Sequence, residues 1–510
     1  MRWTFRYPPL LVFQVFALTC LVTAVACNYP GAAWQSGDIS GDALRQTLVA
    51  QQGLTTPAHG IDATVTPEAA EGVESTPPGS PVLEYTYLSR SGDTLAALSS
   101  RFSVPAEQIL PAQTLPPESY LPVGTRLFIP NNLAGTTPAT LLMPDNAFVY
   151  SPATIGFDIL EYVQQAGGYL STYREFVDGE EISGAEIVQR VASESSVSPR
   201  LLLALLEYQA GWVRGQPKES SNIQYPLGFA VPGRAGLYQE MVMAATHLNI
   251  GYYGWRQGTS LELRFADGST GRISPQVNPG TAGVQNIFAK FYKPEPWQTV
   301  LYGEGNFPEL YRQMFGDPWI DEEPLLPDGL LQPQLELPFR PGEPWSLSGG
   351  PHLSWNTGSP RGALDFSPVT GEAICAVSRA WATAAAPGVI ARAANNVVAL
   401  DLDGDGFEGT GWVLVYVHLA NNELIQAGKQ VALDEALGHP SCERGQSTGK
   451  HVHLARKYNG EWLPAEGPIP YLLSGWLVKS GERNYQGDLV KGDQVVSANP
   501  SGARRSQIVR

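Results

Sequence analysis

The chain of 510 residues exceeds what one hydrophobic core supports, and this length predicts about three domains. Hydrophobic residues make up 43% and charged residues 16%, while 53 glycines and 42 prolines predict loops and linkers rather than a helical bundle. The formal net charge of −16 argues against nucleic acid as a partner, because phosphates require clustered Lys and Arg.

Residues 1–26 have the pattern of a secretory signal: two early arginines, an apolar run over 8–25 and small residues before Cys27. This junction resembles the lipobox of bacterial lipoproteins, with Ala24 where Leu is usual. The resemblance implies a lipoprotein signal peptide and a lipid on Cys27. An uncleaved membrane anchor and plain secretion are the alternatives. We therefore expect an extracytoplasmic protein, lipid-anchored to the cell membrane or secreted.

Two cysteines remain beyond the signal and Cys27, namely Cys375 and Cys442. In an oxidising exterior two leftover cysteines are expected to pair, so they are a possible disulfide. Neither has the spacing to a His that a cysteine zinc site requires.

Residues 27–83 are predicted to be a flexible tether. They are rich in Gly, Ala, Thr, Ser and Pro and show no sustained periodicity. Such a segment buries too little apolar surface to offset its ordering entropy. The alternative is that part of it packs on the first domain.

Residues 84–131 are predicted to form a small βααβ unit. Tyr85–Tyr87 reads as a strand, 95–102 as a helix, 105–110 as the start of a second short helix, and 123–130 as a closing strand. The segments Ser-Gly-Asp-Thr-Leu and Val-Gly-Thr-Arg-Leu-Phe-Ile-Pro resemble the LysM module. This resemblance implies binding of N-acetylglucosamine chains, with a plain spacer domain as the alternative.

Residues 147–319 are predicted to be mainly helical, from apolar spacing in 157–166, 187–192, 201–206 and 238–248. The run 201–212 resembles the catalytic helix of lysozyme-like lytic transglycosylases. Gln209 stands where the general-acid Glu belongs, and an amide cannot protonate a leaving glycosidic oxygen. Glu207 lies about 200° round the helix from that position. We interpret the domain as a lysozyme-like relic or glycan-binding scaffold; an active muramidase using Glu207 is the alternative.

A connector at 324–344 follows, in which six prolines disfavour a helix or central strand. The C-terminal domain is expected at 345–490 and a tail at 491–510. The overall expectation is a multidomain α+β chain whose last domain is antiparallel β.

The C-terminal domain carries the residues that point to chemistry. His451 and His453 are two apart in an apolar strand, so their side chains share a face. His418 ends another apolar strand, and His352 precedes Asp365. Two His and one Asp with an open fourth position are a plausible catalytic zinc arrangement.

These segments resemble the lysostaphin and beta-lytic group of zinc metallopeptidases, which act on cell-wall peptides. Most of that group begins its ligand set with His-x-x-x-Asp, but Arg361 stands four before Asp365 here and cannot bind zinc. The beta-lytic branch has its first His about thirteen residues before the Asp, which is the spacing from His352. The resemblance thus implies Zn²⁺ held by His352, Asp365 and His453.

The same resemblance assigns His418 and His451 as the catalytic histidines of a peptidoglycan endopeptidase. LysM would then hold the glycan strands while wall peptides reach the zinc. The alternative is a non-catalytic envelope protein that binds glycan and recruits or activates a wall hydrolase. Separately, the acidic segment 401–406 is interpreted as a hairpin turn, with half of a calcium loop as the alternative.

Overall fold

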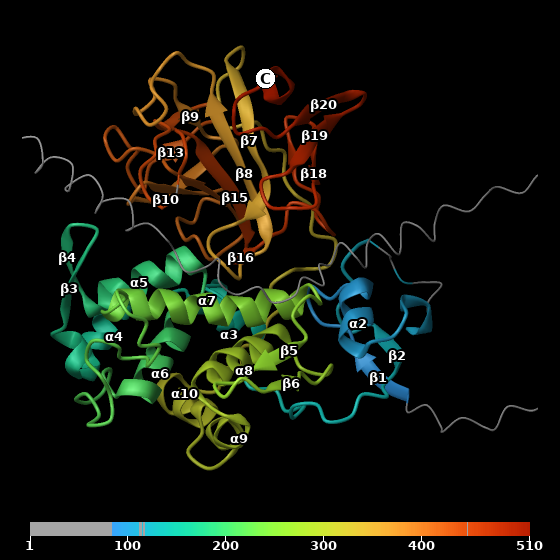
Figure 1. Cartoon of the computed structure of the whole chain (residues 1–510), viewed down its shortest axis with the longest axis vertical. Coiled ribbons are helices and arrows are strands. Elements are labelled where there is room, and N and C mark those ends of the chain that lie inside the picture. The colour runs from blue at the N-terminus through green and yellow to red at the C-terminus, as the bar shows by residue number, and fades with distance from the viewer. Residues whose placement is uncertain (1–83, 112–114, 116–117, 446) are drawn as a thin grey trace, which may run out of the picture. The chain divides into compact units, whose positions relative to one another are not determined.

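The computed structural model describes residues 84–111, 115, 118–445 and 447–510. The predicted signal peptide, Cys27 and tether lie outside the described residues. The described residues belong to one compact unit, in which a small mixed part, a helical part and a β part follow in chain order (Figure 1). Among the described residues, no helix combines the length and hydropathy needed to cross a bilayer.

The first part pairs β1 (Glu84–Leu88) with β2 (Arg126–Pro130) in antiparallel register. Helix α2 (Leu95–Phe102) begins at Thr94, whose side chain accepts from the backbone N–H of Ala97, as an N-cap does. The predicted second helix is a single 3₁₀ turn, η1 (Ala106–Gln108), which Pro105 starts without a side-chain cap. The apolar side chains of these elements, with Ile109 and Leu121, make a small core of their own.

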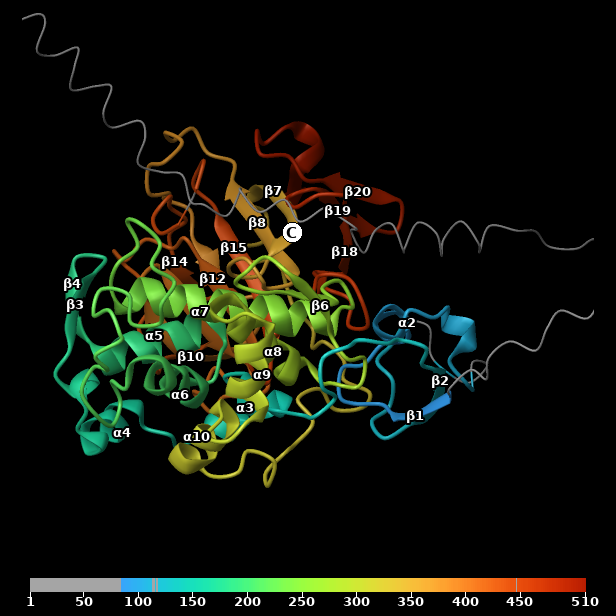
Figure 2. The ribbon, with the colours of Figure 1, turned by 60° about the horizontal axis from the view of Figure 1, so that its bottom comes forward.

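The helical part confirms the predicted apolar periodicity. Its helices are α3 (Asp145–Phe148), α4 (Ile159–Ala166), α5 (Gly184–Ser195), α6 (Pro199–Ala210), α7 (Leu237–Arg256), α8 (Pro279–Phe291), α9 (Pro294–Tyr302) and α10 (Phe307–Phe315). Two hairpins accompany them, β3 (Arg174–Val177) with β4 (Glu180–Ser183) and β5 (Glu262–Arg264) with β6 (Thr270–Arg272). Ser183 and Glu186 form a capping box at the start of α5. Helix α7 lies alongside both α5 and α8 (Figures 1 and 2).

The β part is built on a nine-stranded antiparallel sheet. Its order is β13-β10-β11-β12-β15-β8-β7-β21, with β16 pairing the end of β15. The strands are β7 (Pro344–Leu353), β8 (Arg361–Pro368), β10 (Gly388–Ala394), β11 (Val397–Asp401), β12 (Trp412–Val417), β13 (Gln430–Val431), β15 (Val452–Tyr458), β16 (Glu461–Trp462) and β21 (Gln507–Val509). A separate antiparallel pair joins β9 (Ala382–Thr383) to β14 (Ala436–Gly438). The connector before β7 contains neither helix nor strand.

The structure corrects the prediction that residues 491–510 form a tail. Residues 472–497 form a four-stranded sheet of β17 (Leu472–Leu473), β18 (Trp476–Ser480), β19 (Gly487–Lys491) and β20 (Gln494–Ser497). The last strand, β21, pairs with β7 at the sheet edge, with Ile508 buried. Arg510 forms ion pairs with Glu336 and Asp434. The polar composition of 491–510 concealed these contacts, because they join residues far apart in sequence.

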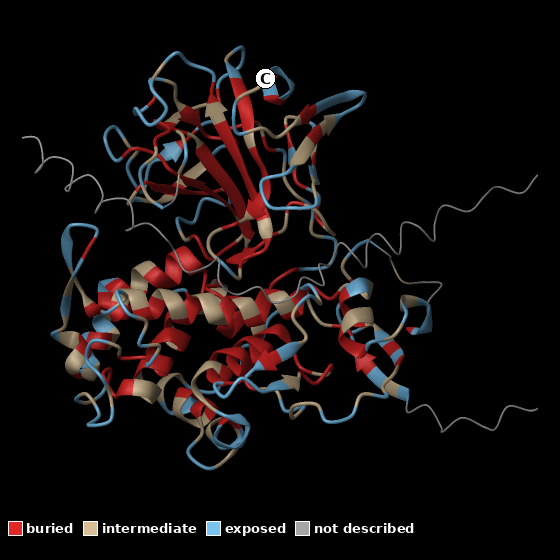
Figure 3. Cartoon of the chain, viewed as in Figure 1, coloured by how far each residue is buried: buried red, intermediate tan, exposed pale blue. Residues whose placement is uncertain are grey.

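The central strands are buried along almost their whole length (Figure 3). Side chains alternate between two faces. Leu414, Tyr416 and Leu454 enter the core of the β part, whereas Val413, Val415 and Ala455 pack into the core of the helical part. The face that carries Ala455 is also the face of His453, two residues earlier.

Candidate metal centre

Four neighbouring strands, β12, β15, β8 and β7, place the predicted residues side by side. Across the sheet, His453 on β15 is in register with Asp365 on β8 and with Val417 on β12, the residue before His418. His352 lies on β7 opposite Ala363, after two register shifts that turn this end of the strand. One potential ligand atom from each of His352, Asp365 and His453 lies within 4.8 Å of the other two.

The hydrogen bonds of the two imidazoles determine which nitrogen is free. His352 Nδ1 is 2.9 Å from the carbonyl oxygen of Gly350, and His453 Nε2 is 3.0 Å from that of Ser354. A carbonyl only accepts, so these two nitrogens carry the protons. The lone pairs of His352 Nε2 and His453 Nδ1 therefore face each other at 2.9 Å. Such backbone bonds on the outer nitrogen are typical of histidines that bind metals.

The cluster requires a positive charge at its centre. Asp365 Oδ1 is buried without a hydrogen-bond donor, 3.3 Å from His352 Nε2 and 3.4 Å from His453 Nδ1. Burial alone would raise the pKa of Asp365, but His352 and His451 hold it well below its ordinary value. Burial lowers the pKa of His453, whereas at His352 Asp365 outweighs burial and raises the pKa. Two nitrogen lone pairs and one carboxylate oxygen that converge in this way fit a zinc ion.

Glycine makes room for this arrangement. A Cβ added to Gly349, which pairs with Asp365, would lie 2.5 Å from Asp365 Oδ2. A Cβ on Gly350 would lie 2.6 Å from the backbone carbon of Gln486. The Gly-Gly pair before His352 therefore lets the carboxylate and a neighbouring loop approach the strand.

His418 and His451 lie beside the cluster. Their ring centroids are 4.4 Å apart, and His451 Nε2 is 3.6 Å from Asp365 Oδ1. His418 has a left-handed backbone (φ 67°) and its Nδ1 donates to the carbonyl of Glu443 at 3.0 Å. His451 Nδ1 donates to Gly449 at 2.7 Å. Both rings thus keep Nε2 available, and burial together with His451 lowers the pKa of His418 to about 4.

Tyr485 is a residue of the site that the sequence analysis missed. Its ring lies over His352, with centroids 4.3 Å apart and planes at 22°. It comes from the loop between β18 and β19, and no motif around it marks it. Arg361, by contrast, donates to the carbonyls of Pro351, Gly481 and Arg483, and so supports the loops beside the centre.

Cys375 and Cys442 form a disulfide with Cα atoms 5.3 Å apart. It joins the loop between β8 and β9 to the loop between β14 and β15. The acidic segment is the turn between β11 and β12, where Asp401 accepts from the backbone N–H groups of Asp403 and Gly406. The predicted turn is thus present, and calcium binding by it stays the alternative interpretation.

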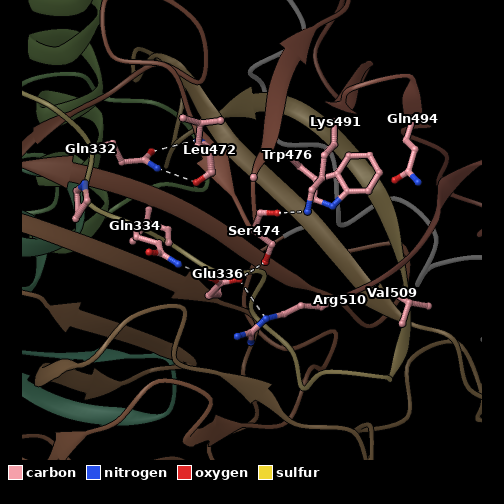
Figure 4. A pocket seen from close by; sticks show the side chains of 13 residues that line it. Gln332, Gln334, Glu336, Leu472, Ser474, Trp476, Lys491, Gln494, Val509 and Arg510 are labelled. Atoms are coloured by element: carbon pink, nitrogen blue, oxygen red, sulfur yellow. Dashed lines mark hydrogen bonds and ion pairs between the residues drawn. The ribbon is translucent and has the colours of Figure 1, made fainter.

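A cavity of about 690 Å³ lies apart from the His/Asp cluster, between the connector and the four-stranded sheet. Figure 4 shows its polar side chains directed at one another: Glu336 pairs with Arg510, and Lys491 Nζ donates to the carbonyl of Ser474. None of the five predicted site residues lines it.

Two family models match the chain. The model of the LysM domain matches residues 90–130, which confirms the predicted module. The model described as the LasA N-terminal domain matches residues 141–327, the helical part.

The chain is also similar to named proteases. It is 25% identical to Protease LasA of Pseudomonas aeruginosa over 373 residues, 68% of this chain and 80% of that one. It is 29% identical to the beta-lytic metalloendopeptidase of Achromobacter lyticus over 198 residues, 37% of this chain and 47% of that one. A solved structure titled a novel M23 metalloprotease, pseudoalterin, from the deep sea has 23% identity and a TM-score of 0.29, covering 35% of this chain and 99% of that one. The similarity to Protease LasA therefore extends well beyond the 141–327 match.

Proposed function

We propose that this chain is a zinc endopeptidase that hydrolyses peptides of the bacterial cell wall. The observation that carries the proposal is the convergence of two imidazole lone pairs and the donor-free Asp365 Oδ1 on one point. The metalloendopeptidase activity, the cell-wall function and the zinc cofactor predicted from the sequence are confirmed by the similarity to Protease LasA and the beta-lytic metalloendopeptidase.

His352 Nε2, Asp365 Oδ1 and His453 Nδ1 would hold the ion. When bound, zinc acidifies a water molecule and polarises the scissile carbonyl. The chain contributes the orientation of its ligands, because the carbonyls of Gly350 and Ser354 fix both imidazole tautomers. Tyr485 covers one side of His352 and limits the approach of solvent there.

His418 and His451 would act on the substrate. Each has its Nδ1–H committed to a backbone carbonyl, so Nε2 is the atom that exchanges a proton or a hydrogen bond with the reacting groups. One imidazole would stabilise the developing oxyanion and the other would deliver a proton to the leaving amine.

The other parts would bring this centre to its substrate. LysM would bind glycan strands, and a lipid on Cys27 would keep the protein at the membrane or the signal would lead to secretion. The lysozyme-like interpretation of the helical part stays a prediction, beside its match to the LasA N-terminal model.

Zinc content and wall hydrolysis test the proposal together. The purified full chain should contain about one zinc ion and release dye-labelled peptide from purified peptidoglycan, and a chelator should stop the release until zinc is restored. A folded protein that neither binds zinc nor releases peptide would favour the alternative, a non-catalytic envelope protein that recruits a hydrolase.

A further inference from the structure

A second candidate site lies in the helical part, away from the zinc ligands. An open groove of about 570 Å³ is lined by residues of α6, of the loop after it, of α10 and of the end of α8. Tyr208, Gln209 and Tyr292 line it together with Lys218, Leu310 and Gln313. We propose that this groove binds an oligosaccharide strand without cleaving it.

The two tyrosine rings are held in place by a shared neighbour. Tyr208 meets Phe288 edge to face at 5.6 Å, and Tyr292 stacks on Phe288 at 6.1 Å. Both tyrosines are half-buried, and burial raises the pKa of Tyr208 to about 12. Pre-positioned aromatic faces suit the CH faces of sugar rings and lose little entropy on binding.

Gln209 and Tyr292 supply neutral polar groups to the groove. Tyr292 Oη donates to Gln209 Oε1 at 3.1 Å, and Gln209 Nε2 donates to the carbonyl of Leu227 at 3.3 Å. The Gln209 amide keeps a second N–H, and Tyr292 Oη keeps its lone pairs. Amides and hydroxyls are the partners that sugar hydroxyl and acetamide groups require, and the ammonium of Lys218 is directed at the backbone carbonyl and the ring of Tyr208.

The groove lacks the means to cleave a glycosidic bond. Of the described residues that line it, only Glu207 carries a carboxylate, and glycosidases usually need two. Glu207 Oε2 accepts from the backbone N–H groups of Val213 and Arg214 at 2.9 and 3.0 Å, and Arg214 Nε lies 3.4 Å from Oε1. These bonds direct the carboxylate at the turn after α6. Glu207 is thus a structural anchor of that turn.

The proposal goes beyond the proposed function, because it needs neither zinc nor peptide hydrolysis. Hydrogen–deuterium exchange of the full chain, with and without a hexamer of N-acetylglucosamine, tests it. We expect slower exchange in residues 207–220 and 292–313, and the LysM segment 84–131 gives a separate reading in the same sample. Tyr292→Ala should weaken protection of the groove at least tenfold, and Tyr292→Phe, which keeps the ring but loses one hydrogen bond, about fivefold.

Gln313→Ala is a second variant that leaves the fold intact, because Gln313 is exposed on α10. It should weaken groove protection and leave the response of residues 84–131 unchanged. The proposal is overturned if the groove segments show no protection up to about 1 mM hexamer. It is equally overturned if Tyr292→Ala protects as wild type does, or if pentaglycine protects the groove and the sugar does not. Zinc content and peptide release are measured separately, so failure here leaves the proposed function standing.

Discussion

Replacing His453 with Ala should remove zinc, because it takes away one of three converging ligand atoms. The binding of zinc to four-ligand peptide sites is worth about 10–16 kcal/mol, so one ligand accounts for about 2.5–4 kcal/mol. At 1.4 kcal/mol per tenfold, the zinc dissociation constant should rise by about 10²–10³-fold. The remaining His352 Nε2 and Asp365 Oδ1, 3.3 Å apart, leave two of four positions unfilled.

His451→Ala provides the matched comparison, since His451 is two residues away and on the same face. It should keep zinc within a few-fold of wild type and slow peptide release by about 10²–10⁴-fold. Zinc is measured by competition with a chromophoric chelator, and turnover by release from labelled peptidoglycan. His439→Ala is the control for removing a histidine that lies outside the cluster, because His439 bonds to Ala380 and Glu423. It should change neither zinc binding nor turnover. If zinc is lost from His451→Ala and retained by His453→Ala, the two assignments are exchanged.

Further predictions concern the supports of this centre and the helical part. Gly349→Ala should weaken zinc binding about tenfold or more, because its Cβ would lie 2.5 Å from Asp365 Oδ2; unchanged affinity by chelator competition would contradict this. Glu461→Ala leaves Arg256, 2.8 Å away and buried, without its main partner, and should destabilise the chain by about 3–5 kcal/mol in urea unfolding; an unchanged midpoint would refute it. Burial lowers the pKa of His247 to about 4. The unfolded chain therefore takes up a proton on this imidazole at a higher pH than the folded chain does, and the free energy of unfolding should fall as the pH drops from about 6.5 toward 4. His247→Phe should flatten this slope, and an equal slope in both proteins would count against the reasoning.

Local patterns accounted for the elements and for much of the candidate site. The period of apolar residues predicted α4, α5, α6 and α7, because packing on one face repeats every three to four residues wherever a helix forms. Because His451 and His453 are two residues apart, their side chains must share one face of any strand that contains both. The spacing from His352 to Asp365, read through a family resemblance, selected the ligand set that the strands bring within 4.8 Å.

Tertiary structure decided what depends on contacts between distant residues. Only sheet register places Asp365 opposite His453, and only the approach of strand to strand shows why Gly349 carries no side chain. Tyr485 reaches His352 from a loop 133 positions later in the chain, by the difference of their numbers, and no local signal encodes such a contact. The polar segment 491–510 folds because β7 offers an open edge that residues 507–509 complete. Register and edge pairing are properties of the assembled sheet, so the sequence by itself predicted which residues form the candidate site, and the fold determined how they lie relative to one another.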